Sequence, residues 1–147
     1  MATSGTMYGS NQPNNGQESR YIVNWQLTAQ NVANNTSSIN WQAKWRFVLN
    51  DRQLDNGNAV INGASRWDNP GRLKDYTGDQ STRDYPLASG TLSITHNPDG
   101  TKSFNINGAT TGYQNAVSSG STNFDLPTIV LPPEPEDPDI IGMLLVL

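Results

Sequence analysis

Apolar and polar residues alternate along two stretches of the chain, and a period of two is typical of a strand with one buried face. The first stretch spans residues 21–28 and the second spans residues 39–47. The apolar faces consist of Tyr21, Val23, Trp25 and Leu27 in the first stretch and of Ile39, Trp41, Ala43, Trp45 and Phe47 in the second. A shift of one residue in the second strand would bury Lys44 and Arg46, so we expect its register to be firmly fixed.

Clusters of turn-forming residues separate the predicted strands. Residues 34–38 (Asn-Asn-Thr-Ser-Ser) predict a turn between the two alternating stretches, and residues 55–58 (Asp-Asn-Gly-Asn) predict another. Alternation returns in residues 92–96 and again in residues 103–107, on either side of Asn-Pro-Asp-Gly at 97–100. Because proline presets φ and glycine accepts a positive φ, we expect a β-hairpin with this turn at its tip.

Composition divides the chain into three parts. Residues 1–19 contain no Leu, Ile, Val, Phe or Trp, which predicts a flexible polar N-terminal arm. Residues 20–129 have the size and strand spacing of an immunoglobulin-like antiparallel β-sandwich. Residues 130–147 form an acidic, Pro-rich spacer followed by an apolar segment at 140–147. The predicted fold class is therefore all-β, with one sandwich between a flexible arm and a Pro-rich, apolar C-terminal tail.

Charge and residue usage exclude several classes of function. The 147-residue chain has a net charge of −4 and no cluster of Lys or Arg, so we expect no nucleic-acid binding through phosphates. It has no cysteine and one histidine, so we expect neither a bound metal nor a cofactor. No apolar stretch approaches the roughly 18 residues that a membrane span needs. The first residues also lack the basic and apolar regions of a signal peptide.

Catalysis would need residues that the chain hardly offers. His96 is the only imidazole, and its position before the predicted turn favours hydrogen bonding to the turn backbone over the role of a general base. Aspartates are frequent in the loop-rich middle, but no spacing places two of them across a cleft, as glycoside hydrolysis requires. We therefore expect a protein that is not an enzyme.

Sugar binding is a second option for the middle of the chain, because flat aromatic rings combined with polar donors and acceptors suit carbohydrates. The candidate residues are Trp67, Asp68, Arg72, Tyr76 and Tyr85. The alternative is that Trp67 and the two tyrosines cap the ends of the sandwich. The sequence leaves both interpretations open.

The apolar segment at 140–147 is a candidate for docking on a partner. Its apolar residues are Ile140, Ile141, Met143, Leu144, Leu145, Val146 and Leu147. Burial of each Leu- or Ile-sized side chain stabilises by about 1.5–3 kcal/mol, so we predict that the segment adds a strand to a neighbouring subunit or fills a groove on it. The alternative is that it folds back onto its own sandwich.

Three groups of residues together resemble a family of siphophage minor structural and tail proteins with immunoglobulin-like domains. The groups are Trp25 with residues 34–37 and Trp41, then residues 95–101 (Thr-His-Asn-Pro-Asp-Gly-Thr), and finally residues 119–121 with residues 124–129 (Phe-Asp-Leu-Pro-Thr-Ile). Similar segments of that family read roughly His-x-x-Asp-Gly-Thr and Leu-Pro-Thr-Ile, in this order. The resemblance covers about residues 20–129.

The resemblance implies a non-enzymatic component of the virion surface, assembled in the host cytoplasm, with capsid or tail subunits as partners and a role in host adhesion. Members of the family continue from Leu-Pro-Thr-Ile with Pro-Arg and another domain, whereas Val130 and Leu131 lead here into the spacer. A minor tail protein, a fibre and a capsid decoration protein therefore all stay open, as does homo-oligomerisation. The alternative function is a carbohydrate-binding adhesin module that recognises host surface glycans.

Overall fold

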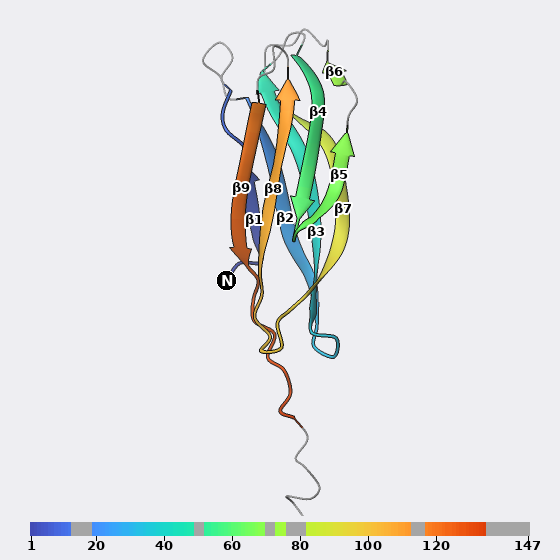
Figure 1. Ribbon diagram of the computed structural model, residues 1–147, viewed down its shortest axis with the longest axis vertical. Coiled ribbons are helices and arrows are strands. Elements are labelled where there is room, and N and C mark those ends of the chain that lie inside the picture. Colours follow the sequence, from blue (N-terminus) through green and yellow to red (C-terminus); the bar gives the residue numbers. More distant parts are fainter. Residues whose placement is uncertain (13–18, 49–51, 70–72, 76–81, 113–116, 135–147) are drawn as a thin grey trace, which may run out of the picture.

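The computed structural model describes residues 1–12, 19–48, 52–69, 73–75, 82–112 and 117–134, in which nine strands and no helix occur. The strands are β1 (Ser4–Tyr8), β2 (Arg20–Asn31), β3 (Thr36–Val48), β4 (Arg52–Ile61), β5 (Ala64–Asn69), β6 (Leu73–Asp75), β7 (Thr82–Thr95), β8 (Ser103–Gly112) and β9 (Val117–Asp125). They form two antiparallel sheets that pack face to face (Figure 1). The predicted all-β sandwich is confirmed, and its architecture is consistent with an immunoglobulin-like domain.

The two sheets differ in size and in strand order. One has four strands in the order β1-β2-β3-β7, and the other has the order β5-β4-β8-β9 with β6 paired to β4. The two alternating stretches of the sequence are β2 and β3, which pair directly and place Trp25 opposite Trp41. Their connecting turn occupies residues 32–35, two positions earlier than predicted, and Asn35 takes the positive φ of 51° that the reversal needs.

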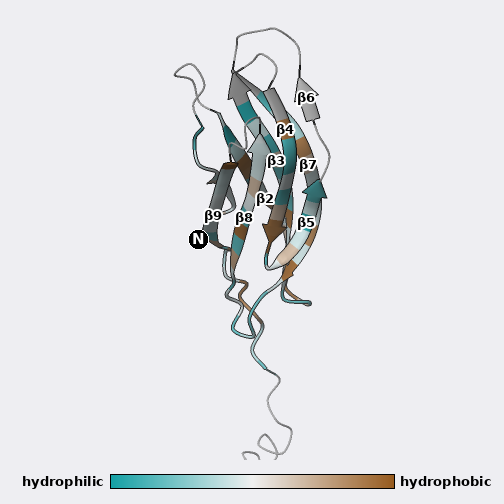
Figure 2. Ribbon diagram, turned by 45° about the horizontal axis from the view of Figure 1, so that its top comes forward, coloured by the Kyte–Doolittle hydropathy of each residue, from teal (hydrophilic) through white to brown (hydrophobic). Residues whose placement is uncertain are grey.

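The core lies between the sheets. It includes residues that the alternation predicts, such as Trp25, Ile39 and Trp41, together with Met7 of β1 and Ile61 of β4. Hydrophilic and hydrophobic bands alternate along the strands (Figure 2). The ring of Trp25 makes edge contacts with Phe104 and Phe124 of the opposite sheet, at centroid distances of 5.1 and 5.4 Å. Tyr21 also crosses the core: its hydroxyl donates to the carbonyl of Asn58 at 2.8 Å. Burial raises the pKa of that phenol well above its ordinary value.

The predicted flexible arm at residues 1–19 is wrong for its described part, because β1 is an integral strand of the four-stranded sheet. Met7 is completely buried and pairs with Val23. Gly5 is required beside it, since a Cβ there would lie 2.5 Å from Nε1 of Trp25. The large rings against which β1 packs, such as Trp25 and Phe124, belong to other strands. The segment can therefore pack into the core although it contains almost no large apolar residue of its own.

The predicted hairpin around residues 97–100 is also wrong, although the turn itself forms. The amide of Gly100 donates to the carbonyl of Asn97 at 2.8 Å, and the amide of Asn97 donates to that of Thr101 at 2.8 Å. However, β7 belongs to the four-stranded sheet and β8 to the other, so the turn carries the chain across the sandwich. Turn chemistry fixes a reversal of direction but does not decide which sheet the next strand joins.

Residues 55–58, predicted as a turn, lie inside β4 instead. Gly57 serves packing there, because a Cβ would come within 2.6 Å of the Trp67 ring. The reversal comes at Asn62 and Gly63, whose φ angles of 54° and 77° are those of a two-residue hairpin loop between β4 and β5. Asn-Gly is the usual sequence of such a loop.

Candidate functional site

Parts of all three groups of residues that carry the family resemblance meet at one end of the sandwich. This end, called the base, consists of the turn at residues 32–35, residues 96–101 and residues 126–129. Figure 1 shows the β2–β3 and β7–β8 connections side by side there, and residues 130–134 lead away from the same end. Leu126 and Ile129 are buried in the base, whereas Val130 is 85% exposed.

His96 joins the parts of the base to one another. Its Nδ1 lies 2.7 Å from the carbonyl oxygen of Gly100, so this nitrogen must carry the proton and donate. Its Nε2 lies 2.7 Å from Oγ of Ser37 on β3. The prediction that the ring bonds the turn backbone is confirmed.

Further hydrogen bonds hold the outgoing chain against the base. The amide of Ile129 donates to the carbonyl of Gly100 at 2.9 Å. The side chain of Gln30 donates to the carbonyl of Pro127 at 2.9 Å, and that of Asn35 donates to the carbonyl of Asn97 at 2.7 Å. The direction in which the chain leaves the sandwich is therefore fixed by several elements at once.

The pair of Ser37 and His96 has the composition of a nucleophile and its base but not the accessibility. Ser37 is completely buried, and His96 is 5% exposed. The second nitrogen of the imidazole is occupied by a backbone carbonyl of the turn. A substrate could reach neither group, so the arrangement acts as a structural clasp.

The described residues of the predicted sugar site do not share one surface. Trp67 packs against the core, with its ring centroid 6.5 Å from that of Tyr21. Asp68 follows it in β5 and therefore points to the opposite side of the strand. Tyr85 belongs to β7 in the other sheet and packs with Trp45 and Leu54. Arg72 and Tyr76 lie outside the described residues.

The predicted docking residues, 140–147, also lie outside the described residues. Within the described part, no set of three or more His, Asp or Glu side chains is arranged to hold a metal ion. The same part holds no helix of the length and hydropathy required to cross a membrane.

The outer side of the four-stranded sheet carries a regular array of hydroxyl and carboxamide side chains, called the polar face. Two rows cross the sheet from β1 to β7 in register, and none of their side chains is ionisable or apolar. The rows are Thr6, Asn24, Gln42 and Ser89, and then Ser4, Gln26, Asn40 and Thr91.

An open hollow of about 600 Å³ lies over this array, which is a size typical of small-molecule sites. The lining residues are Ser4, Gly5, Thr6, Asn24, Trp25, Gln26, Asn40, Trp41 and Gln42. Thr6 donates to Oδ1 of Asn24 at 2.9 Å, and Thr91 donates to Oδ1 of Asn40 at 2.7 Å. Gln26 and Gln42 are exposed, and their side chains make no hydrogen bond with another described residue.

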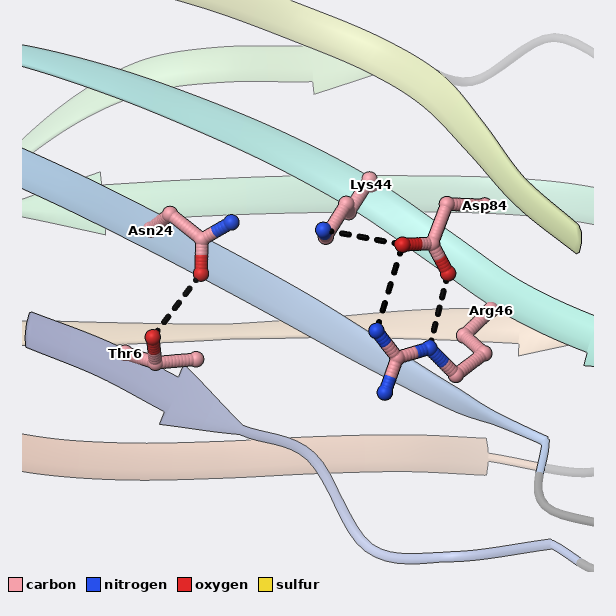
Figure 3. A network of polar contacts seen from close by, with 5 residues as sticks. All are labelled: Thr6, Asn24, Lys44, Arg46 and Asp84. Atoms are coloured by element: carbon pink, nitrogen blue, oxygen red, sulfur yellow. Dashed lines mark hydrogen bonds and ion pairs between the residues drawn. The ribbon is translucent and has the colours of Figure 1, made fainter.

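Charged groups adjoin the hollow but bind one another. Figure 3 shows Lys44 and Arg46 of β3 converging on Asp84 of β7, beside the bond between Thr6 and Asn24. Nζ of Lys44 lies 2.9 Å from the carboxylate, and Nε of Arg46 lies 2.7 Å from it. The hydrogen bond from Arg46 is the main cause that lowers the pKa of Asp84 to about 2, so the carboxylate stays ionised at neutral pH.

The sequence pattern identified the polar sides of β2 and β3 but not this array as a site. Asn24, Gln26, Asn40 and Gln42 are among the outward residues of those strands, and outward residues of a strand are ordinarily polar. The available signal was that four of them are carboxamides. Only the cross-strand register shows that they form one block.

No model of a known protein family matches the chain, and a search of curated proteins gives no match.

Proposed function

We propose that this chain is a non-enzymatic structural protein of a tailed-bacteriophage virion, which displays its sandwich at the particle surface. The observation that carries the proposal is that parts of all three resemblance groups converge at the base. Residues 34–37, 95–101 and 124–129 are far apart in the sequence, yet hydrogen bonds join all three around His96 and Gly100.

This convergence gives the shared segments a physical role. Together they set the place and direction in which the chain leaves the body, and a Pro-rich acidic spacer follows directly. From its composition we expect such a spacer to be extended and semi-rigid, so that it would hold a folded body away from its point of attachment. A rigid body with a fixed exit onto a stiff spacer suits display better than it suits catalysis.

The partners follow from the same arrangement. Capsid or tail subunits would bind the apolar segment at 140–147, which the sequence predicts as the docking element. The body would then face outward, toward the host surface. Many copies on one particle would give avidity even where each contact is weak.

Localisation on purified particles tests the proposal. Electron microscopy of virions should reveal a sandwich-sized density at a repeated surface position, and an antibody against the folded body should label intact particles there. If gradient-purified particles lack the chain altogether, the proposed function is wrong. If the antibody labels only disrupted particles, display at the surface is wrong.

A further inference from the structure

We infer that the polar face is a binding site for an uncharged, polyhydroxylated polymer, namely a neutral glycan. This site differs from the aromatic candidates of the sequence. The inference goes beyond the structural role proposed above and does not depend on it, because binding can be measured on the free protein.

The hydrogen-bonding chemistry of the array matches that of a sugar. A carboxamide carries two N–H donors and a carbonyl acceptor, and a hydroxyl both donates and accepts. Sugar hydroxyls need both kinds of partner in close spacing. Gln26 and Gln42 offer both from exposed side chains without a partner in the described residues, and Asn24 and Asn40 are held in place by threonine hydroxyls.

The array lacks the groups that would bind a charged polymer or a protein. The two rows contain no cation to attract a phosphate or carboxylate polymer and no apolar side chain to form the core of a protein interface. The nearest cations, Lys44 and Arg46, both contact Asp84. The absence of charge in the two rows favours a ligand that is itself neutral.

The array repeats from strand to strand across the sheet. Neighbouring strands lie about 4.8 Å apart, so each row presents four hydrogen-bonding groups at regular intervals across the sheet. A linear polymer with hydroxyls on every unit can follow such a row, whereas a compact molecule would use only part of it. The rows hold no aromatic ring for stacking, so each site should bind weakly.

Nuclear magnetic resonance of the ¹⁵N-labelled full chain tests the inference. The probes are short glucan, mannan and galactan oligosaccharides, with oligogalacturonate and inorganic phosphate as charged counterparts. At millimolar concentration, at least one neutral probe should shift the side-chain NH₂ signals of Asn24, Gln26, Asn40 and Gln42 in a saturable way. The signal of Asn56, on the outer side of the other sheet, should stay in place.

A pair of isosteric variants separates the site from a general surface effect. The double variant Gln26→Glu/Gln42→Glu keeps the shape but replaces NH₂ donors with carboxylates, so the affinity for the active probe should fall about tenfold, as expected for the loss of one or two hydrogen bonds. Asn56→Asp is the matched control and should leave the affinity unchanged. All three side chains are exposed, so both variants should unfold at the wild-type urea concentration.

Four outcomes would overturn the inference. They are the absence of a saturable shift with every neutral probe, binding of the charged probes alone, shifts around Trp67 and Asp68 in place of the polar face, and shifts of the polar face that depend on protein concentration without any sugar. The last result would assign the face to a second copy of the chain. None of these outcomes bears on whether the protein belongs to the virion.

Discussion

A comparison of Gly100 with Gly63 shows how Gly100 stabilises the base. Gly100 and Gly63 have similar φ angles, 83° and 77°, which L-residues rarely adopt. A Cβ on Gly100 would overlap the carbonyl oxygen of buried Ile129, whereas a Cβ on Gly63 would point into open space. Replacing either glycine by an L-residue therefore carries a similar cost in backbone conformation. Only at Gly100 does the added Cβ also clash with neighbouring atoms.

Gly100→Ala should therefore destabilise the domain more than Gly63→Ala does. The second change should cost about 1–2 kcal/mol through the left-handed backbone alone. The first should cost roughly 2 kcal/mol more, because the clash is with backbone that hydrogen bonds hold in place. Urea unfolding of both variants measures the difference, and equal costs would show that the exit of the chain is not fixed against the turn.

The ion cluster at Asp84 predicts a dependence of stability on pH. Its pKa falls from 3.8 to about 2 on folding, so the native state favours the ionised form. A lowered pKa contributes stability that is complete above about pH 4 and disappears as the pH falls toward 2. Because the carboxylate is 37% exposed, Asp84→Asn should cost only about 0.5 kcal/mol at pH 7. Unfolding free energies of both proteins should converge near pH 2, and a gap that stays constant would contradict this account.

At the scale of elements, the sequence predicts those strands whose side chains themselves form the core. Trp25 and Trp41 mark the inward faces of β2 and β3, and the structure pairs them. The hairpin at residues 97–100 could not be predicted correctly, because which sheet accepts β8 depends on contacts that are distant in the sequence. The same limit hid the polar face, since its rows exist only through strand register. His96 was predicted correctly because its partner lies four residues away.

The sequence pattern missed strand β1. A substitution at Met7 tests how much this strand contributes to the stability of the domain. The side chain is completely buried, so Met7→Ala should cost about 2–5 kcal/mol. Tyr8→Ala is the control on the same strand: its ring is 53% exposed and lies over the guanidinium of Arg20 at 5.5 Å, so the cost should stay within about 1 kcal/mol. Thermal unfolding would compare them. If Met7→Ala is as mild as Tyr8→Ala, residues 1–12 do not behave as part of the core.

At the scale of the molecule, the first residue and the last residues of the described chain both lie next to the base. Residues 130–134 leave from there, and Met1 lies within 3.3 Å of the amide of Thr128. The end of β3, the end of β8 and the start of β9 lie at the other end of the sandwich (Figure 1). Attachment through either terminus would thus leave the same end pointing away.

Deletion of residues 139–147 tests attachment through the apolar segment. If the segment docks on a neighbouring subunit, the shortened protein should unfold at the wild-type temperature but be lost from particles. The deletion removes several apolar side chains, and the burial of each in the partner would stabilise attachment by about 1.5–3 kcal/mol. A version in which a polar Gly-Ser segment of equal length replaces the deleted residues controls for chain length. A destabilised free protein would mean instead that the segment packs on its own sandwich.

The closing contact between the first and last strands also governs how the domain can form. The amide of Ala2 donates to the carbonyl of Asp125, and that of Ser10 donates to the carbonyl of Ser119, so β1 and its flanks depend on β9. When only the first hundred residues have been synthesised, the chain contains neither Ser119 nor Asp125. We therefore expect the nascent chain to stay open until synthesis passes residue 125, and the barrier to folding to be dominated by loop-closure entropy.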